Sequence, residues 1–363
     1  MDRNIVLMTA NTGGGIIQFT VQLYHSLVEL GCKVTVCVPS AAKDSNVSEV
    51  NEADLLTYKK EKKVFDNAPY RALAKRIAEK KPDCIWYCDD SAVCAKTGIA
   101  LSRYRIVQML TVHDAGGYHP TNRVTLKTAL MRAYLKALCR RWYRSVSRFV
   151  LLSPESENSF KRRFVKSSSK AVCMNLGAHI PHNAEIMPPE MGTLKRERYL
   201  LFFGRIDKYK GIENLLNAYS RAPLPHLPLV IAGSGSLTEN EKQLAFSNER
   251  ITVINRFIAD GEMKWLFANC AAVMLPYIEA TQSGVIPIAY AYGKPVAVSD
   301  VPGLTQFVDD GKTGTICKNE NDWINAITLY SGETDDNTAA AVRSYYDEHM
   351  DWEKNLKRLF ENL

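Results

Sequence analysis

The sequence predicts an α/β protein with two domains, each built on a doubly wound parallel sheet. A chain of 363 residues is longer than one hydrophobic core usually supports. Short apolar strands alternate with helical patterns over residues 1–182 and again over 198–337, which indicates parallel strands joined by right-handed helical crossovers. Residues 183–197 are rich in proline and predict a linker. A closing helical pattern covers 338–363.

The first half reads as six strands and four helices. Its strands are continuous apolar runs, as expected for a parallel sheet that is covered on both faces. The expected strands are Ile5–Thr9, Lys33–Pro39, Cys84–Cys88, Ile106–Val112, Phe149–Ser153 and Ala171–Leu176, and the expected helices are Ile16–Leu30, Ala68–Lys80, Leu126–Val146 and Glu155–Phe164.

The second half restarts this alternation, although we see no close sequence repeat between the halves. Because open α/β sheets bind ligands at the carboxyl ends of their strands, we expect the two domains to face each other across a cleft lined by those ends. The expected strands are Arg198–Gly204, Pro228–Gly233, Ile251–Ile254, Ala272–Leu275 and Val296–Ser299, and the expected helices are Ile212–Arg221, Glu239–Ala245, Glu262–Ala268, Pro287–Tyr292, Leu304–Val308 and Ala339–Leu363.

The composition is that of a cytoplasmic globular protein. Hydrophobic residues make up 46% and charged residues 23% of the chain. No run of about 18 apolar residues occurs, and no signal-peptide pattern precedes the first strand. The nine cysteines show no CxxC pairing, so we expect a reducing compartment and no cysteine zinc site.

Positive charge gathers on one predicted helix. The chain has a net charge of +7, and a basic amphipathic pattern over 127–144 suits contact with an anionic membrane on the inner face. An ordinary packed helix with a solvated basic face explains the same pattern. Nucleic acid is not an expected partner, because no nucleic-acid-binding motif accompanies the charge. The cations are Lys127, Arg132, Lys136, Arg140, Arg141 and Arg144.

A basic loop follows the strand Arg198–Gly204. Arg205 offers a bidentate fork and Lys210 a point charge, and this pair suits a diphosphate at the ligand-binding edge of the sheet. The alternative is that both are solvated loop charges, with Asp207 as a salt-bridge partner.

A polar loop follows the strand Ala272–Leu275. Glu279 could accept hydrogen bonds from two sugar hydroxyls, while Gln282, Ser283 and the amides near Gly284 could donate to a phosphate. The plainer interpretation is a polar loop that caps the next helix.

The first half contributes two more loops at strand ends. Gly14 and Gly15 follow the first strand and open a helix, where a glycine backbone can approach a ligand closely. This is not the dinucleotide fingerprint, since no acidic residue ends the second strand, and a tight turn without a ligand is the alternative. His113 and Asp114 follow the strand Ile106–Val112 and could bind or orient a substrate hydroxyl.

A metal ion is not expected. His113 and His119 flank Asp114, but no third ligand is evident, and no Asp-x-Asp pair occurs anywhere in the chain. We expect no cofactor.

Assembled in this order, the motifs resemble those of the GT-B glycosyltransferases, specifically the retaining enzymes of glycosyltransferase family 4. The resemblance covers nearly the whole chain and is looser in the first half, at Gly13–Gly15, Thr111–Asp114 and Leu176–His179. It is strongest at Gly204-Arg205, Lys210-Gly211, Gly233-Ser234-Gly235, Gly293-Lys294-Pro295-Val296 and Asp310-Gly311-Lys312-Thr313-Gly314.

The resemblance implies a nucleoside diphosphate sugar that is bound mainly by the second half. Arg205 and Lys210 would stabilise the diphosphate as leaving group, the electrostatic effect expected to dominate catalysis. The loop Gly13–Gly15 would close over the donor, His113 would contact its sugar, and the last helix would cross back onto the first half. The anomeric configuration would be retained, without a protein nucleophile.

One position departs from the family pattern. The usual signature has two glutamates separated by seven residues, and here the second position is Ile288 and the first is Ala280, one residue after Glu279. The second glutamate normally holds the ribose. We assign the sugar-binding role to Glu279 and expect a branch of the family built around residues 279–284.

The sequence therefore predicts a metal-independent hexosyltransferase. It would move a sugar from a UDP- or GDP-linked donor to a glycan or lipid-linked acceptor in the assembly of cell-envelope or capsular polysaccharide. Two alternatives stay open. One is a GT-B nucleotide-sugar epimerase, which needs carboxylates and histidines placed for proton abstraction. The other is a non-catalytic nucleotide-sugar-binding module, which Ile288 suggests.

Overall fold

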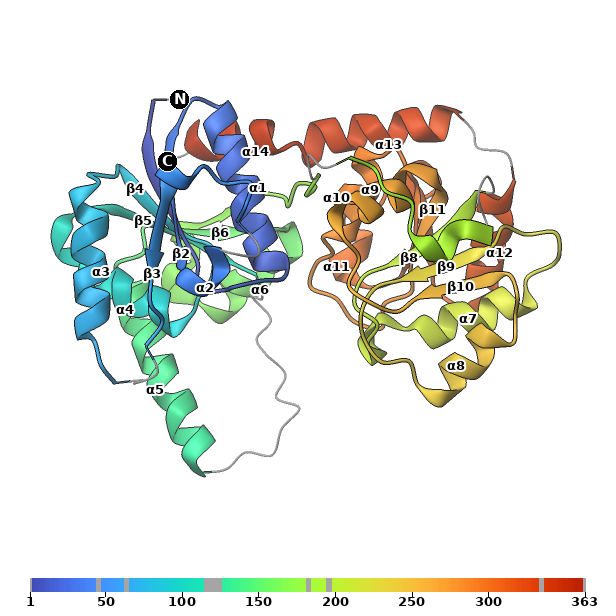
Figure 1. Cartoon of the computed structure of the whole chain (residues 1–363), viewed down its shortest axis with the longest axis horizontal. Helices are drawn as coiled ribbons and strands as arrows, with labels where there is room; N and C mark the ends of the chain where they lie inside the picture. Colours follow the sequence, from blue (N-terminus) through green and yellow to red (C-terminus); the bar gives the residue numbers. More distant parts are fainter. Residues whose placement is uncertain are drawn as a thin grey trace. The chain divides into compact units, whose positions relative to one another are not determined.

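The protein folds into two compact units, each an open parallel sheet covered by helices (Figure 1). Unit 1 is Met1–Asn175 with Trp352–Leu363, and unit 2 is Leu176–Asp351. The α/β fold with two doubly wound sheets is thereby confirmed. The computed structural model describes residues 2–43, 47–61, 65–113, 126–180, 184–193, 198–332 and 336–361.

In the described part of unit 1, seven parallel strands lie in the order β3-β2-β1-β4-β5-β6-β7. The chain reverses its direction of travel across the sheet between β1 and β4, which makes their carboxyl ends the switch point. The strands are β1 (Asn4–Met8), β2 (Lys33–Pro39), β3 (Leu55–Tyr58), β4 (Cys84–Tyr87), β5 (Val107–Val112), β6 (Arg148–Leu151) and β7 (Ala171–Cys173).

Successive side chains of β4 show how both faces of this sheet are covered. Trp86 packs edge-on against Phe360 of α14, whereas Tyr87 packs edge-on against Trp142 of α5, because neighbouring residues of a strand point to opposite faces. Helices α3, α4 and α5 pack side by side, and α1 packs on α14. The helices are α1 (Gly15–Glu29), α2 (Ser40–Lys43), α3 (Ala68–Glu79), α4 (Ala92–Leu101), α5 (Leu126–Tyr143), α6 (Pro154–Arg163) and α14 (Trp352–Glu361), with short 3-10 helices at Glu52–Asp54, Ser102–Tyr104 and Val165–Lys170.

The described residues of unit 2 form a six-stranded parallel sheet in the order β10-β9-β8-β11-β12-β13. Its switch point lies between β8 and β11. Strands β8, β9 and β11 are wholly apolar and almost entirely buried, so they form the centre of the core. The strands are β8 (Tyr199–Phe203), β9 (Leu229–Ala232), β10 (Ile251–Ile254), β11 (Cys270–Leu275), β12 (Val296–Ser299) and β13 (Gly314–Cys317).

The helices of unit 2 pack in two groups. Helix α7 packs on both α8 and α12, and α10 packs on α13. The helices are α7 (Ile212–Arg221), α8 (Glu239–Phe246), α9 (Asp260–Asn269), α10 (Val285–Ala291), α11 (Pro302–Thr305), α12 (Glu320–Ser331) and α13 (Asp336–His349), with 3-10 helices η4 (Pro189–Thr193) and η5 (Lys208–Lys210). None of the helices in the described residues is long and apolar enough to cross a bilayer.

The strands and α-helices that the sequence patterns do not predict include β3, β13, α4, α12 and the single-turn helix α2. Helix α4 is buried along most of its length and so lacks the one-sided apolar stripe of a surface helix. The strands β3 and β13 are short and lie at sheet edges. Half of the residues in each strand are only partly buried, so neither strand has to be a continuous apolar run. The sequence signal for helix α12 is a capping box formed by Asn319 and Asp322 at its amino end.

The predicted closing helix, Ala339–Leu363, is two helices. The chain breaks after His349, so that α13 packs in unit 2 and α14 belongs to unit 1. Trp352 at the start of α14 contacts Phe19 of α1, and the side chain of Asn355 donates to the backbone oxygen of Asn175. Most other boundaries agree within about three residues.

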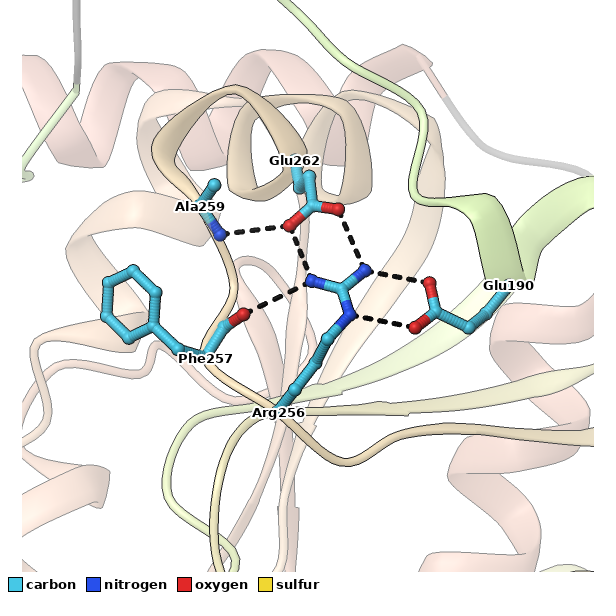
Figure 2. A network of polar contacts seen from close by, with 5 residues as sticks. All are labelled: Glu190, Arg256, Phe257, Ala259 and Glu262. Atoms are coloured by element: carbon cyan, nitrogen blue, oxygen red, sulfur yellow. Dashed lines mark hydrogen bonds and ion pairs between the residues drawn. The ribbon is translucent and has the colours of Figure 1, made fainter.

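Residues 184–193, which the sequence assigns to a linker, pack against unit 2. The backbone of Ile186 donates to the oxygen of Gly261 at 2.9 Å, and Met191 is fully buried in the core. Arg256 then forms ion pairs with Glu190 and Glu262, as Figure 2 shows. These contacts tie the described part of the linker to the loop between β10 and α9.

Candidate functional site

Four loops of unit 2 begin at one level along the carboxyl edge of its sheet. Phe203 at the end of β8 and Ile254 at the end of β10 both pair with Ala232 at the end of β9. On the other side, β8 pairs with β11 through Leu201 and Val273. The loops that follow β10, β9, β8 and β11 therefore lie next to one another in that order.

The loop after β8 carries Arg205 and lies against the glycine turn after β9. The backbone of Ile206 donates to the oxygen of Ser234 at 3.0 Å. A side chain at Gly233 would meet the oxygen of Gly204 at 1.8 Å, so only glycine permits this approach. Beside them lies an open pocket of about 640 Å³, lined by Arg205, Ile206, Asp207, Lys208, Ser234, Gly235, Ser236 and Thr238.

The loops after β8 and β11 are fixed to each other. The backbone of Ile278 donates to the oxygen of Tyr209 at 2.8 Å. Gly211 has a positive φ of 64°, and a side chain there would meet the oxygen of Pro276 at 2.0 Å. The structure thus brings together the two segments that the sequence assigns to a diphosphate and a sugar.

Lys210 lies in this junction, half-buried against aromatic rings. Its ammonium nitrogen is 3.5 Å from the ring centre of Tyr277 and 4.9 Å from that of Tyr209, which is cation–π geometry. Burial, and then the nearby charge of Arg205, lower the pKa of Lys210 to about 7, while Asp207 opposes them with a smaller effect. Lys210 is therefore a cation that an anionic ligand would stabilise.

The loop 279–284 is divided between exposed and supporting side chains. Glu279 is exposed and Gln282 is half-buried, whereas Ser283 is buried and its hydroxyl oxygen accepts from the backbone of Val285 at 3.2 Å. Gly284 is exposed and immediately precedes α10. Ser283 thus supports the turn in front of α10, whose N-cap is Gly284, and Glu279 is the charged side chain of the loop that is exposed.

Ile288 belongs to the core of unit 2. Its side chain is 8% exposed and sits on α10 between Pro287 and Ala289, which are also buried. In this chain, the residue at the position of the family's second glutamate therefore packs in the hydrophobic core of unit 2.

In unit 1 the glycine loop lies at the switch point of its sheet. Gly14 has a positive φ of 77° and is the N-cap of α1, which begins at Gly15. Both glycines are exposed, and no atom lies within 4 Å of the position that a side chain would take at either. The amino end of α1 is thus exposed.

A buried carboxylate that the sequence analysis misses anchors this loop. Asp89, at the end of β4, is 4% exposed and accepts from the hydroxyl of Thr9 at 2.5 Å and the backbone of Ala10 at 2.7 Å. Burial opposes its ionisation, but hydrogen bonds from Ser91, Thr9 and Ala10 outweigh burial and hold the pKa of Asp89 below its usual value. The sequence signal that could have identified Asp89 is its position as an acidic residue directly after the apolar run Cys84–Cys88.

His113 lies beside the same edge, at the end of β5. A ring nitrogen is 2.8 Å from the backbone oxygen of Cys88, and the ring packs edge-on against Phe19. Burial lowers the pKa of His113, while the contact with Cys88 and the charge of Asp89 oppose this to a lesser extent, so the imidazole is neutral at neutral pH.

Asp114 and His119 lie outside the described residues. Among the residues that are described, no cluster of three or more histidine, cysteine or acidic side chains has the arrangement of a metal site.

The basic helix α5 and the residue that follows it carry exposed cations. Leu130 is 65% exposed near the amino end of α5, and Phe65, which is 69% exposed, packs edge-on against Tyr134 of the same helix. In Figure 1 this end of α5 extends beyond the sheet of its unit. The exposed cations are Arg132, Lys136, Arg140, Arg141 and Arg144.

Comparison with known proteins assigns the two halves to one family. Residues 13–174 match the model of Glycosyltransferase Family 4, and residues 197–330 match that of Glycosyl transferases group 1.

Curated relatives match a smaller part of the chain. An uncharacterized glycosyltransferase of Methanocaldococcus jannaschii is 30% identical over 122 residues, which cover 32% of this chain and 31% of that protein. A D-inositol 3-phosphate glycosyltransferase of Nocardioides sp. is 29% identical over 175 residues, 42% of this chain and 38% of that protein. The matched region thus spans about a third of the length of these relatives.

Solved structures match the whole chain. The crystal structure of Anabaena HepE in complex with UDP has a TM-score of 0.72 at 16% identity and covers 99% of this chain and 100% of that one. At this identity the likeness establishes the fold. With both halves matched by family models and the fold shared over its full length, the chain belongs to the GT-B glycosyltransferases of family 4.

Proposed function

We propose that this protein transfers a sugar from a nucleoside diphosphate donor to a glycan or lipid-linked acceptor, with retention of the anomeric configuration and without a metal ion. The observation that carries the proposal is the junction of the loops after β8 and β11, where Lys210 packs on the ring of Tyr277 close to the charge of Arg205, and where the exposed Glu279 directly follows Ile278, whose backbone bonds to Tyr209. Arg205 and Lys210 can pair with the negative charge of a diphosphate, and the carboxylate of Glu279 can accept hydrogen bonds from the hydroxyls of a sugar.

In the proposed reaction the bond between the anomeric carbon and the diphosphate oxygen breaks, and the acceptor oxygen attacks the same face. The acceptor proton passes to the departing diphosphate. Arg205 and Lys210 stabilise the negative charge that develops on the leaving group, and Glu279 accepts hydrogen bonds from the sugar.

The donor base is proposed to be uracil or guanine, and the test is a donor panel. Purified protein is incubated with UDP- and GDP-linked hexoses and with glycan and lipid-linked acceptors in the presence of EDTA, and NMR follows the anomeric proton of the transferred sugar. We expect release of UDP or GDP and a product with the donor's configuration. An inverted product would contradict retention, and an epimerised donor sugar that stays linked to its nucleotide would favour the epimerase. Nucleotide binding without any turnover would favour the binding module.

Lys210 gives the proposed donor site a pH dependence. Since the free pKa of Lys210 is lowered to about 7, a diphosphate that pairs with the ammonium group must raise this pKa on binding. Above that pH, binding requires proton uptake, and the affinity for UDP-glucose should fall by up to about tenfold per pH unit. Calorimetry between neutral and alkaline pH measures this slope. The variant Lys210→Arg, which stays protonated, should flatten it, and an unchanged slope would assign the titration to another group.

We further propose that α5 contacts an anionic membrane that presents the acceptor, as in the assembly of cell-envelope polysaccharide by a peripheral protein of the inner face. The helix carries exposed cations together with the exposed Leu130, and the exposed Phe65 packs on its Tyr134, so it combines the charge and apolar surface that interfacial helices use.

Sedimentation with liposomes tests this contact. The protein should bind vesicles with anionic lipid, bind neutral vesicles far less, and be released by salt. Replacing three α5 cations by alanine should weaken binding by roughly 100-fold, since each cation near such a surface contributes about 1 kcal/mol. The changes are Arg132→Ala, Lys136→Ala and Arg140→Ala, and the charge-matched control is Arg71→Ala and Lys75→Ala on α3 together with Lys80→Ala at its C-cap. Equal binding of both triple variants to anionic vesicles would show that α5 does not contact the membrane and is an ordinary packed helix.

A further inference from the structure

We propose that a pocket at the amino edge of the unit 1 sheet binds a phosphate monoester between the guanidinium groups of Arg3 and Arg148. Open α/β sheets bind their substrates at the opposite edge, where the strands end, so this pocket is not a substrate site of that kind. It belongs to unit 1, whereas Arg205 and its pocket belong to unit 2. The inference therefore does not depend on the proposed function.

Four neighbouring strands form the pocket. Arg3 directly precedes β1 and Arg148 begins β6, while β4 and β5 lie between them in the sheet. The amino ends of β4 and β5 therefore form the floor, and the two arginines flank it on opposite sides. The pocket has a volume of about 180 Å³ and is lined by Arg3, Asp83, Cys84, Val107, Met109, Ser147 and Arg148.

The strand register turns both arginines to the same face of the sheet. Residues that pair across neighbouring strands share a face, and so do residues two positions apart along one strand. The pairs are Ile5 with Cys84, Cys84 with Val107, and Met109 with Arg148. Since Arg3 precedes Ile5 by two positions, Arg3 and Arg148 project from one face of the sheet.

Arg3 is held by a contact that leaves its hydrogen-bond donors unused. Its guanidinium carbon lies 5.0 Å from the ring centre of Phe360 of α14, and this ring packs in turn against Trp86. A cation–π contact of this kind uses none of the five N–H donors of an arginine. Within the described residues, the guanidinium of Arg3 forms neither a hydrogen bond nor an ion pair.

Arg148 also has unused donors. One of its terminal nitrogens donates to the backbone oxygen of Ser147 at 3.1 Å, and its guanidinium makes no other hydrogen bond or ion pair with the described part of the chain. Both arginines are half-buried. Two guanidinium groups that line one small pocket repel each other, and a phosphate that accepts hydrogen bonds from both would remove this repulsion.

One carboxylate opposes the two cations. Asp83 is the acid among the described residues that line the pocket, and one of its oxygens accepts from the backbone of Asn4 at 2.7 Å. Burial raises the pKa of the Cys84 thiol on the floor to about 12, and against this the charge of Arg3 lowers it by more than Asp83 raises it. The positive charge therefore dominates at the floor of the pocket.

The size of the pocket selects a small ligand. Sites for drug-sized molecules begin at roughly 300 Å³, so a volume of about 180 Å³ suits a phosphate with a few carbon atoms and is too small for a nucleotide. The side chain of Val107, which is 43% exposed, offers apolar surface to those carbon atoms. A phosphate monoester carries close to two negative charges at neutral pH, which match the two arginines.

Calorimetry of the whole chain with inorganic phosphate and with glycerol 3-phosphate tests the site. Measurement at about 0.15 M salt screens the contribution of distant surface charges. The variants Arg148→Gln and Arg3→Gln should each lose about 10- to 100-fold in affinity for glycerol 3-phosphate, the usual effect of removing hydrogen bonds to a charged group.

Two further variants show whether the pocket itself is responsible. Asp83→Asn keeps an oxygen for the backbone of Asn4 but removes the negative charge, so it should bind glycerol 3-phosphate about 2- to 5-fold more tightly. Damage to the fold would not tighten binding. Arg144→Gln removes an exposed cation that does not line the pocket and should bind like the wild type.

Vesicles distinguish a lipid headgroup from a free ester. Phosphatidic acid presents a phosphate monoester, whereas phosphatidylserine at equal surface charge does not. If Arg148→Gln weakens binding to phosphatidic acid vesicles alone, the ligand is a headgroup, and if it weakens binding of the soluble ester alone, the ligand is free. The proposal is overturned if Arg148→Gln and Arg144→Gln behave alike, or if the wild-type chain binds neither the soluble phosphates nor phosphatidic acid through Arg148.

Discussion

The double variant Arg205→Ala, Lys210→Ala should lose at least about 1,000-fold in the rate of sugar transfer while it keeps the wild-type circular dichroism spectrum. Each residue is proposed to stabilise charge that develops on the leaving diphosphate, and removing one preorganised group of this kind typically costs about 100- to 1,000-fold. The folded state should persist, because Arg205 is exposed and Lys210 is partly desolvated, which disfavours its own charge.

Surface lysines of the same unit provide the control for net charge. Lys242 and Lys312 form ion pairs with Glu239 and Asp309 on the exposed surface, and such pairs contribute little to stability. The variant Lys242→Ala, Lys312→Ala removes as much positive charge and should transfer sugar at nearly the wild-type rate. Retained transfer in the Arg205 and Lys210 variant would remove both residues from the leaving-group site.

The variant Gly211→Ala should lose about 100-fold in transfer rate, although it touches no charged group. A methyl group there would overlap the backbone oxygen of Pro276 and drive apart the loops that follow β8 and β11. Displacing reacting groups by about 1 Å can cost a factor of this size. Steady-state kinetics should show the loss mainly in the turnover number, because both cations remain.

The variant Gly311→Ala is the control that separates the effect of this overlap from the effect of backbone strain. Gly311 also has a positive φ, of 80°, but no atom lies within 4 Å of an added side chain. Both variants should lose about 1–2 kcal/mol of stability from the left-handed backbone, measured by urea unfolding. Only Gly211→Ala should transfer sugar more slowly than the wild type. Equal transfer rates in the two variants would show that the junction of the loops after β8 and β11 is not needed for transfer.

The sequence predicts the sheets and the cationic loop because these features depend on neighbours along the chain. Apolar runs give β8 and β11, and Arg205 and Lys210 directly follow one of these runs. Parallel topology then brings the loops after both strands to one edge. The hydrogen bond from the backbone of Val285 to Ser283 is likewise local, because the two residues are two positions apart.

The features that the sequence does not predict depend on distant partners. Asp89 meets Thr9 across 80 positions, and Arg256 meets Glu190 across 66. The ring of Tyr277 lies under Lys210 only because Gly211 and Pro276 come into contact. The burial of Ile288 likewise depends on how α10 packs on the sheet, so the sequence shows the substitution but not its place in the core.

Hydrogen exchange of the whole chain with saturating UDP, and in parallel GDP, tests the central claim most directly. The account predicts slower exchange in residues 204–211, 233–238 and 276–284, because a diphosphate at Arg205 and Lys210 would fix all three loops. The turn at 309–314 precedes β13 at the opposite edge of the sheet and should be unchanged. Binding detected by calorimetry that leaves the three loops unprotected, or no binding of either nucleotide, would contradict the account.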